Sequence, residues 1–347
     1  MSDILPLTGD LVLAWTEFVR TTAGSSPYHL PDWWKVFAEG LGYAFHGLAQ
    51  VKDGGIVAGL PLYQVPGFVT GRLAGPPFRD RGGILAAPGV DVAPLVAAAA
   101  RQAAGRPLCL RQEQPLSPAL VREFGLHEDG GWLTTRVDLT AGSKALWEKL
   151  GNNASGPVRQ ASRQGVAVRP GRDIRDMRLF YDIFVRCRRR LGSPCFPWRF
   201  FRSLWDNLSG SGAARLLLAE HEGLAVAGMI LLVHKTRVID GYAASLPGSE
   251  RLRANDLLVW SALEWAAGNG FSDFDFGADS PGQIGLLAFK RKWLGGNVPM
   301  YAYHLGPGTG KRPDASRGVY RLAAAVIRRT PLPLYKTASR LLVSRLG

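Results

Sequence analysis

The sequence predicts an α/β protein made of two similar domains, each a mixed, mostly antiparallel sheet flanked by helices. Three observations predict this fold. The chain has 347 residues, which is enough for two domains of ordinary size. Its apolar fraction of 46% can fill a core, and strand-like and helix-like periods alternate along it. The order helix, strand, glycine-containing turn and returning strand occurs in both halves.

The first half, which we assign to residues 1–140, begins with an amphipathic helix that carries Pro31 in its first turn. Lys52-Asp53-Gly54-Gly55 is predicted to be a hairpin turn between two strands. The expected elements are a helix from Pro31, strands at 45–51 and 56–63, a helix ending near Ala104, and strands at 107–111 and 132–139.

The second half, residues 141–306, repeats this order, and Val-Ala-Gly at 226–228 matches Val-Ala-Gly at 57–59. The repeat of both motif and element order indicates a duplicated domain. The expected elements are a strand at 165–169, helices at 174–191 and 198–208, strands at 214–220, 225–234 and 237–244, a helix at 256–267, a strand at 271–276, a helix from Pro281, and a strand at 298–304.

The stretch 271–296 of the second half concentrates charge at the ends of its elements. Residues 271–276 alternate apolar and polar side chains, which predicts a strand that Gly277 closes. The next helix is predicted to have Asp279 as its N-cap and to end in Lys290-Arg291-Lys292-Trp293. A cationic helix end suits an anionic ligand, or a negative charge that develops during a reaction.

The chain is strongly basic, with 42 Lys and Arg against 28 Asp and Glu and a formal net charge of +14. This excess predicts anionic partners such as nucleic acid, acidic lipid or a phosphorylated substrate. Residues 307–347 form a basic tail with two amphipathic helices. These helices could lie on an anionic membrane leaflet, bind tRNA phosphates, or dock on the first domain.

Cys109, Cys187 and Cys195 lack the spacing of a metal site, and no nucleotide-binding motif is present. We therefore expect neither a metal nor a cofactor. The N-terminus has no signal-peptide pattern, and no window has the roughly 18 apolar residues that cross a membrane. A monomer is expected in the cytoplasm, with contact to the inner membrane face through the basic tail.

Four stretches together resemble the GNAT acyltransferase fold in duplicate, and in particular the Fem-type (FemAB) transferases and their acetyltransferase branch. The ending 328–334 further resembles a subgroup tied to exopolysaccharide export. The resemblance implies amide formation, with an aminoacyl group from aminoacyl-tRNA in Fem-type enzymes and an acetyl group from acetyl-CoA in ordinary GNAT enzymes. The four stretches are 57–62, 146–166, 273–277 and 289–295.

The choice of acyl donor depends on the loop 249–256, Ser-Glu-Arg-Leu-Arg-Ala-Asn-Asp. A GNAT domain that uses CoA has a glycine-rich loop there, whose backbone N–H groups face the pyrophosphate. The glycines are absent here, which favours aminoacyl-tRNA. Arg251 and Arg253 could still hold phosphates through their side chains, so acyl-CoA remains an alternative. The acceptor is expected to be an amine on an envelope glycan, a lipid-linked precursor or a metabolite.

The resemblance implies catalytic roles for Lys290 and for Asp80. Fem-type enzymes have a functional lysine in the segment that matches Phe289-Lys290, where it could stabilise an oxyanion. They also have an aspartate after a Gly-Pro, and Asp80 follows Gly75-Pro76 with a spacing about two residues longer. Asp80 or Asp275 could deprotonate the amine. The alternative is that these residues form ordinary ion pairs or a solvated helix end.

Further residues are candidates for substrate binding, mainly because arginines can hold phosphates. Each could equally belong to a solvated basic face or, for the tryptophan, to the core. A non-catalytic accessory protein of exopolysaccharide or envelope machinery is therefore a rival hypothesis. The substrate-binding candidates are Arg79, Arg81, Arg159, Arg163, Arg188, Arg189, Arg251 and Trp293.

Overall fold

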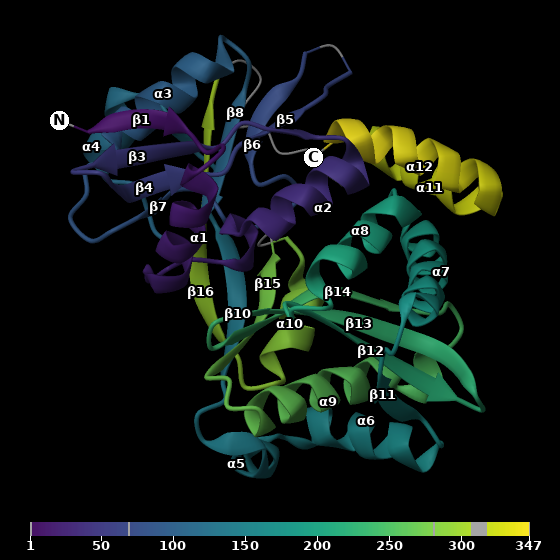
Figure 1. Cartoon of the computed structure of the whole chain (residues 1–347). Helices are drawn as coiled ribbons and strands as arrows, with labels where there is room; N and C mark the ends of the chain where they lie inside the picture. The colour runs from purple at the N-terminus through teal and green to yellow at the C-terminus, as the bar shows by residue number, and fades with distance from the viewer. Residues whose placement is uncertain (1, 69, 280–281, 307–317, 347) are drawn as a thin grey trace. The chain divides into compact units, whose positions relative to one another are not determined.

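The computed structural model of the chain describes residues 2–68, 70–279, 282–306 and 318–346 (Figure 1). Residues 307–317 of the predicted tail and Pro281 of the predicted helix lie outside the described residues. The chain folds into two compact units. Unit 1 comprises Met1–Trp132, Pro299–Pro313 and Leu341–Gly347, and unit 2 comprises Leu133–Val298 and Asp314–Arg340.

Unit 1 combines two sheets with helices on their faces. Its elements are β1 (Asp3–Pro6), α1 (Leu11–Thr21), the short 3-10 helix Pro27–His29, α2 (Pro31–Leu41), β2 (Ala44–Phe45), β3 (Leu48–Lys52), β4 (Gly55–Leu60), β5 (Tyr63–Val65), β6 (Arg72–Gly75), β7 (Leu85–Ala86), α3 (Ala93–Ala103), β8 (Leu108–Gln112), α4 (Pro118–Glu123), β9 (His127–Glu128) and most of β16 (Gly296–Leu305). One sheet has the order β1-β3-β4-β7, and β16, β8, β6, β5 and β2 are neighbours in the other. The alanine-rich helix α3 buries Leu95, Val96 and Ala99 in the core of this unit.

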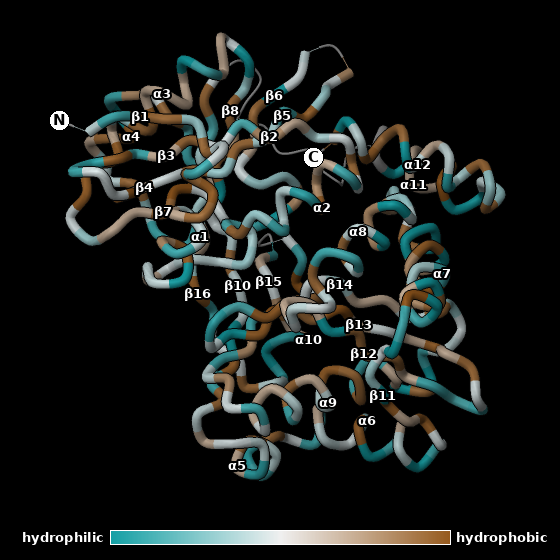
Figure 2. The backbone as a smooth tube through the Cα atoms, in the orientation of Figure 1, coloured by the Kyte–Doolittle hydropathy of each residue, from teal (hydrophilic) through white to brown (hydrophobic). Residues whose placement is uncertain are grey.

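Unit 2 is built on the strand order β11-β12-β13-β14-β15-β10. Its elements are β10 (Trp132–Asp138), α5 (Gly142–Lys149), α6 (Asn152–Arg163), β11 (Ala167–Pro170), α7 (Ile174–Leu191), α8 (Trp198–Leu208), β12 (Ala214–His221), β13 (Leu224–His234), β14 (Arg237–Ser245), the 3-10 helix Glu250–Leu252, α9 (Ala254–Gly268), β15 (Asp273–Asp279), α10 (Ile284–Arg291), α11 (Gly318–Arg329) and α12 (Leu332–Leu346), the last up to Arg340. Helices α7 and α8 cover one face of the sheet, and α9 with α6 covers the other (Figure 1). Helix α7 alternates hydrophilic and hydrophobic residues, as a helix with one buried face does (Figure 2).

The two units repeat one order of elements, as the sequence predicts. In unit 1 a strand, two helices and two strands (β1-α1-α2-β3-β4) are followed further along the chain by a strand, a helix and a strand (β6-α3-β8). In unit 2 the same order is formed by β11-α7-α8-β12-β13 and then β14-α9-β15. The strands before and after the last helix of this order pair in parallel in both units. In unit 1 these strands are β6 and β8, on either side of α3, and in unit 2 they are β14 and β15, on either side of α9. The predicted tandem fold of mixed sheets flanked by helices is therefore confirmed.

One predicted strand is wrong. The sequence predicts a single strand at 56–63, but β4 ends at Leu60 and β5 begins at Tyr63 in the other sheet. Pro61 separates them, because proline has no N–H to donate to a neighbouring strand.

The predicted tail helices exist as α11 and α12. Helix α11 packs against the end of α7 so closely that a Cβ placed on Gly192 would lie 2.6 Å from the Cβ of Ala324. At the start of α12, the Tyr335 hydroxyl donates to the Ser193 carbonyl over 2.7 Å. The last turns of α12 pack in unit 1, where the Tyr43 hydroxyl donates to the Val343 carbonyl over 2.8 Å.

Candidate active site

The pairing of strand β15 with both of its neighbours in unit 2 is interrupted part-way along the strand. Its parallel pairing with β14 covers three residue pairs and ends where Ile239 lies opposite Asp275. On the other side, the register against β10 shifts between Arg136 and Thr134, so that two residues of β15 lie opposite one residue of β10. This is a β-bulge, and bulges redirect the side chains around them.

The two residues of β15 in the bulge are Phe276 and Gly277, opposite Thr135 of β10. Gly277 has φ +73°, a left-handed conformation that glycine adopts without the steric cost of a Cβ. The prediction that Gly277 closes the strand is therefore wrong, since β15 bends at Gly277 and continues to Asp279. Asp279 is also not the N-cap of the next helix, because Gln283 holds that position.

Lys290 of α10 is buried against this bulge. Its Nζ donates to the carbonyls of Phe276 and Gly277 over 2.8 and 2.9 Å and lies 2.5 Å from Oδ2 of Asp279. The side chain of Lys290 is 7% exposed, so it is not a solvated helix end. The ammonium is therefore held by two backbone hydrogen bonds and one ion pair. Lys290 thus binds the backbone that the bulge leaves out of sheet pairing.

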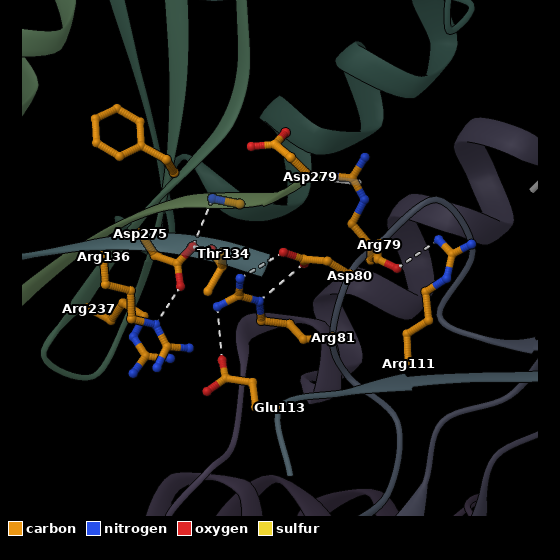
Figure 3. A network of polar contacts seen from close by, with 12 residues as sticks. Arg79, Asp80, Arg81, Arg111, Glu113, Thr134, Arg136, Arg237, Asp275 and Asp279 are labelled. Carbon is orange, nitrogen blue, oxygen red and sulfur yellow. Dashed lines mark hydrogen bonds and ion pairs between the residues drawn. The ribbon is translucent and has the colours of Figure 1, made fainter. Parts of the chain in front are cut away.

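Asp275 is fully buried and also binds the bulge (Figure 3). Its carboxylate accepts hydrogen bonds from the Gly277 N–H over 2.8 Å and from the Thr134 hydroxyl over 2.5 Å. Arg136 Nε donates to its second oxygen over 2.7 Å. Asp273, on the same strand, pairs with Arg237. Both carboxylates are therefore bound to arginines.

Asp240 of β14 is a further carboxylate near the bulge. Its side chain is partly exposed and has no ion pair or hydrogen bond with the described residues. Desolvation raises the pKa of Asp240 to about 6; the nearby Lys290 ammonium opposes this rise, and the carboxylates of Asp279 and Asp275 add to it. A carboxylate with a pKa near neutrality is suited to take up and release a proton at physiological pH.

Asp80, the other predicted carboxylate, lies in the unit 1 loop that follows β6. Arg81 binds it through two hydrogen bonds, from Nε to Oδ1 over 3.1 Å and from Nη2 to Oδ2 over 2.7 Å (Figure 3). Arg81 also donates to Glu113 over 2.8 Å and has a side chain only 1% exposed. Arg79 stacks its guanidinium over the Tyr28 ring at 5.6 Å. Arg81 is therefore a buried structural cation in unit 1.

The remaining substrate-binding candidates of unit 2 lie in four places: helix α6, the end of α7, the loop before α9 and the core. Arg159 stacks over Trp147, and Arg163 of the same helix is exposed. Arg188 donates to the Pro194 carbonyl, whereas Arg189 lines a cavity described below. Arg251 is exposed in the loop before α9, and Trp293 is fully buried in the core.

The loop before α9 uses its own backbone donors. Ser249, Leu252 and Arg253 donate their N–H groups to carbonyls within the loop, and the Gly248 N–H donates to the Glu250 carboxylate over 2.9 Å. The first turn of α9 contains the buried Asp256, which pairs with Lys292. A carboxylate therefore already occupies the end of the helix that favours anions.

Sequence reasoning missed Asp240, and also Arg136 as the partner of Asp275. A signal for Asp240 was present, because it is the only acid in the otherwise apolar strand sequence Val-Ile-Asp-Gly-Tyr at 238–242. No group of three or more His, Cys, Asp or Glu within the described ranges could hold a metal ion. The described helices include none that is both long and apolar enough to cross a bilayer.

Residues 149–291 match a family model described as an acetyltransferase (GNAT) domain. This match lies within unit 2 and spans the bulge, Asp240 and Lys290. A search of curated protein sequences finds no match.

Three solved structures share the fold at low sequence identity. FemX has a TM-score of 0.67 and 15% identity, covering 87% of this chain and 97% of FemX. A tandem GNAT protein from the clavulanic acid biosynthesis pathway, solved without AcCoA, has a TM-score of 0.57 and 14% identity over 90% and 100% of the two chains. L-PGS from Bacillus licheniformis has a TM-score of 0.56 and 13% identity over 92% and 97%. The chain thus contains a segment that matches an acyltransferase domain, and it shares the fold of these three proteins.

Proposed function

We propose that unit 2 forms an amide by transferring an acyl group to an amine at the β15 bulge. The observation that carries the proposal is Asp240, a partly exposed carboxylate without an ion pair among the described residues, beside the buried Lys290 and within the matched acyltransferase domain. An amine is mostly protonated at neutral pH and attacks a carbonyl only after it loses a proton. Asp240 is the group of this site best suited to accept that proton.

The reaction then assigns different roles to the charged residues. The ammonium gives one proton to Asp240, and the amine nitrogen bonds to the carbonyl carbon of the donor. The bond from that carbon to the donor's oxygen or sulfur breaks, and a second proton from the nitrogen goes to this leaving atom. The Lys290 ammonium stabilises the developing oxyanion through its field, since its N–H groups are engaged by Asp279 and two carbonyls. Asp275 positions the bulge, and we expect no direct part in catalysis for it or for Asp80.

For the donor we propose aminoacyl-tRNA. The loop before α9 supports this choice, because the N–H groups of Gly248, Ser249, Leu252 and Arg253 donate within the loop and Asp256 lies in the first turn of the helix. A pyrophosphate would have to displace these contacts. The net charge of +14 also suits a polyanionic donor.

Acyl-CoA is the second candidate donor. The matched family model is described as an acetyltransferase, and one protein of the same fold is named together with AcCoA. Arg251 and Arg253 are exposed in the loop before α9 and could bind phosphates through their side chains. The acceptor that we propose is an amine on a metabolite or on an envelope glycan or lipid-linked precursor, used at the cytoplasmic side.

The donor is identified by offering the protein two labelled donors in parallel. The protein is incubated with a cell extract that supplies amines, and with either a pool of tRNA charged with isotope-labelled amino acids or labelled acetyl-CoA. Mass spectrometry then detects the labelled amide. We expect label from charged tRNA. Label only from acetyl-CoA would reassign the donor, and no product from either would favour the non-catalytic accessory protein.

The role of Asp240 is tested by the pH dependence of turnover in Asp240→Asn and Asp240→Glu. We expect turnover of the natural protein to rise as the pH passes about 6, because a base acts only when deprotonated. Asp240→Asn should lose this rise and lower turnover by about 100-fold or more, whereas Asp240→Glu should retain part of it. An unchanged profile in Asp240→Asn would remove Asp240 from the reaction.

A stability measurement gives an independent check on the environment of Asp240. Its pKa in the folded protein lies above the ordinary value of 3.8, so the folded state favours the protonated carboxyl. Asp240 therefore lowers the stability of the protein as the pH rises from about 4 to about 6. Asp240→Asn should reduce this pH dependence.

A further inference from the structure

The end of α7 and the tail helix α11 enclose a cavity lined by arginines. Its volume is about 550 Å³. Three of the arginines, Arg186, Arg189 and Arg190, come from the last turns of α7, and Arg328 comes from α11. Leu246, Pro247 and Leu332 complete the lining. We call this cavity the arginine pocket.

The arginine pocket carries more positive charge than its neighbours neutralise. Only Arg190 has an acidic partner among the described residues, with Glu250 at 3.1 Å. Four arginines and one glutamate leave a net charge of +3. The Nε of Arg189 is buried and has no acceptor among the described residues. A buried N–H without an acceptor is costly, so this geometry is suited to an anionic ligand.

A basic end of α7 could serve only to balance the dipole of that helix, since cations are favoured at helix C-termini. The same effect favours Arg328, which lies in the last turn of α11, but it does not explain why the ends of two different helices bring their arginines into one pocket. Arg328 is fixed in place, because its Nε donates to the Arg190 carbonyl over 3.2 Å. The pocket therefore depends on the close packing of α11 on α7 and is not a property of α7 alone.

An apolar groove adjoins the arginine pocket and shares Arg328 with it. This groove has a volume of about 900 Å³. Its apolar lining comes from Leu191, Leu322, Ala324 and Ala325 together with the turn that follows α7, and Arg321 lines it beside Arg328. Leu322 and Leu191 are 67% and 50% exposed, and Val326 of α11 is 58% exposed nearby. Exposed apolar side chains beside a cluster of cations form an amphiphilic surface.

We propose that the arginine pocket binds the phosphate group of an anionic lipid, with part of an acyl chain in the apolar groove. Arginine binds phosphate through paired N–H groups, which explains the four guanidinium groups. A soluble phosphate or the phosphate backbone of tRNA would use the pocket but not the groove. This site gives the proposed acyltransferase a membrane partner. Lipid binding is measured without turnover, so its failure is distinguishable from failure of the proposed reaction.

The experiment measures binding of the full chain to two kinds of vesicle, pure phosphatidylcholine and phosphatidylcholine mixed with phosphatidylglycerol. The test variant is Arg186→Gln with Arg189→Gln. The control is Arg175→Gln with Arg202→Gln, which removes the same charge from α7 and α8 at side chains that are 91% and 64% exposed and lie outside the pocket. Circular dichroism and thermal unfolding of both variants establish that they are folded.

We expect the natural protein to bind the mixed vesicles more tightly than the neutral ones. Each pocket arginine should contribute about fivefold in affinity, so the test variant should bind on the order of 25-fold more weakly. The control should stay within a few-fold of the natural protein. Equal losses in test and control variants would mean that only net charge matters, and this would overturn the proposal.

Leu322→Ser separates a lipid from other phosphates. We expect it to weaken vesicle binding several-fold and to leave the binding of inorganic phosphate unchanged. The same variants are then titrated with total tRNA. If the arginine pair is needed for tRNA but not for vesicles, the pocket is a nucleic-acid site and the lipid proposal is wrong.

Discussion

The two units repeat one order of elements, but their sheets are interrupted differently. In unit 1 the chain leaves one sheet after Leu60 and enters another at Tyr63, so β4 and β6 lie in different sheets. In unit 2 the strand order is continuous from β11 to β15, and the interruption is a bulge at Phe276 and Gly277. Buried charges gather at the bulge, and in the loop that follows β6 in unit 1.

The difference lies in how completely these charges are paired. In unit 1, the guanidinium of Arg81 bonds to both oxygens of Asp80 and to Glu113. In unit 2, Lys290 and Asp275 bind the bulge, while Asp240 remains without an ion pair in the described part of the chain. A carboxylate with a pKa of about 6 is thus a feature of unit 2. We infer that the duplicated fold keeps a paired, structural network in one copy and a titratable group in the other.

Among the substitutions that test this comparison, Lys290→Met is expected to have the largest effect on stability. The substitution removes a buried ammonium, its ion pair with Asp279 and the donor to two backbone carbonyls. We expect the free energy of unfolding to fall by about 3–5 kcal/mol, as for other broken buried ion pairs. Chemical denaturation measures this change, and turnover should be lost with it.

Lys144→Met is the matched control, because Lys144 is an exposed lysine of the same unit. It should change the free energy of unfolding by less than about 0.5 kcal/mol. If Lys290→Met is as stable as Lys144→Met, then Lys290 does not hold the bulge.

Asp80→Asn tests whether the unit 1 network is only structural. The asparagine keeps the volume of the side chain but removes the charge that Arg81 binds through two hydrogen bonds. We expect the free energy of unfolding to fall by about 1–3 kcal/mol, while turnover per folded molecule is retained. Asp53→Asn, at an exposed aspartate in a hairpin of the same unit, is the control.

Turnover distinguishes the two roles that the sequence leaves open for Asp80. If turnover of Asp80→Asn collapses while Asp53→Asn remains active, Asp80 is a catalytic base and unit 1 contributes directly to the reaction. The contrast between a structural and a titratable network would then be wrong.

Much of the fold could be predicted because local patterns decide it. The predicted helices 174–191 and 198–208 have the same bounds as α7 and α8, whose apolar residues recur at helical spacing. The error at Gly277 has a general cause. Glycine is a turn signal in sequence, but a single left-handed glycine can also sit inside a strand as a bulge.

The candidate site was less predictable because its contacts join distant residues. Asp279 precedes a helix, which suggests a local cap, but its partner Lys290 lies eleven positions further on, at the other end of that helix. Arg136 reaches Asp275 from a strand 139 positions earlier, and Arg328 meets Arg190 across 138 positions. Local sequence rules describe neighbours along the chain, whereas these pairs form only once the sheet and the tail helices have packed.

Gly277→Ala is expected to have the smallest effect on stability. It tests directly whether the bulge of unit 2 positions the titratable group. A Cβ at φ +73° costs about 1 kcal/mol in stability. Gly54→Ala is a close control, since Gly54 lies in an exposed hairpin of unit 1 at φ +78° with no atom within 4 Å of an added Cβ. Both variants should lose similar stability in chemical denaturation.

Turnover should separate these two variants. Gly277→Ala shifts the two carbonyls that Lys290 binds, and thereby the position of Lys290 relative to Asp240, so we expect turnover to fall by about tenfold. Gly54→Ala has no connection to these groups and should leave turnover unchanged. If Gly277→Ala retains full turnover with the same loss of stability, the bulge is a structural irregularity, and the proton transfer assigned to Asp240 does not depend on it.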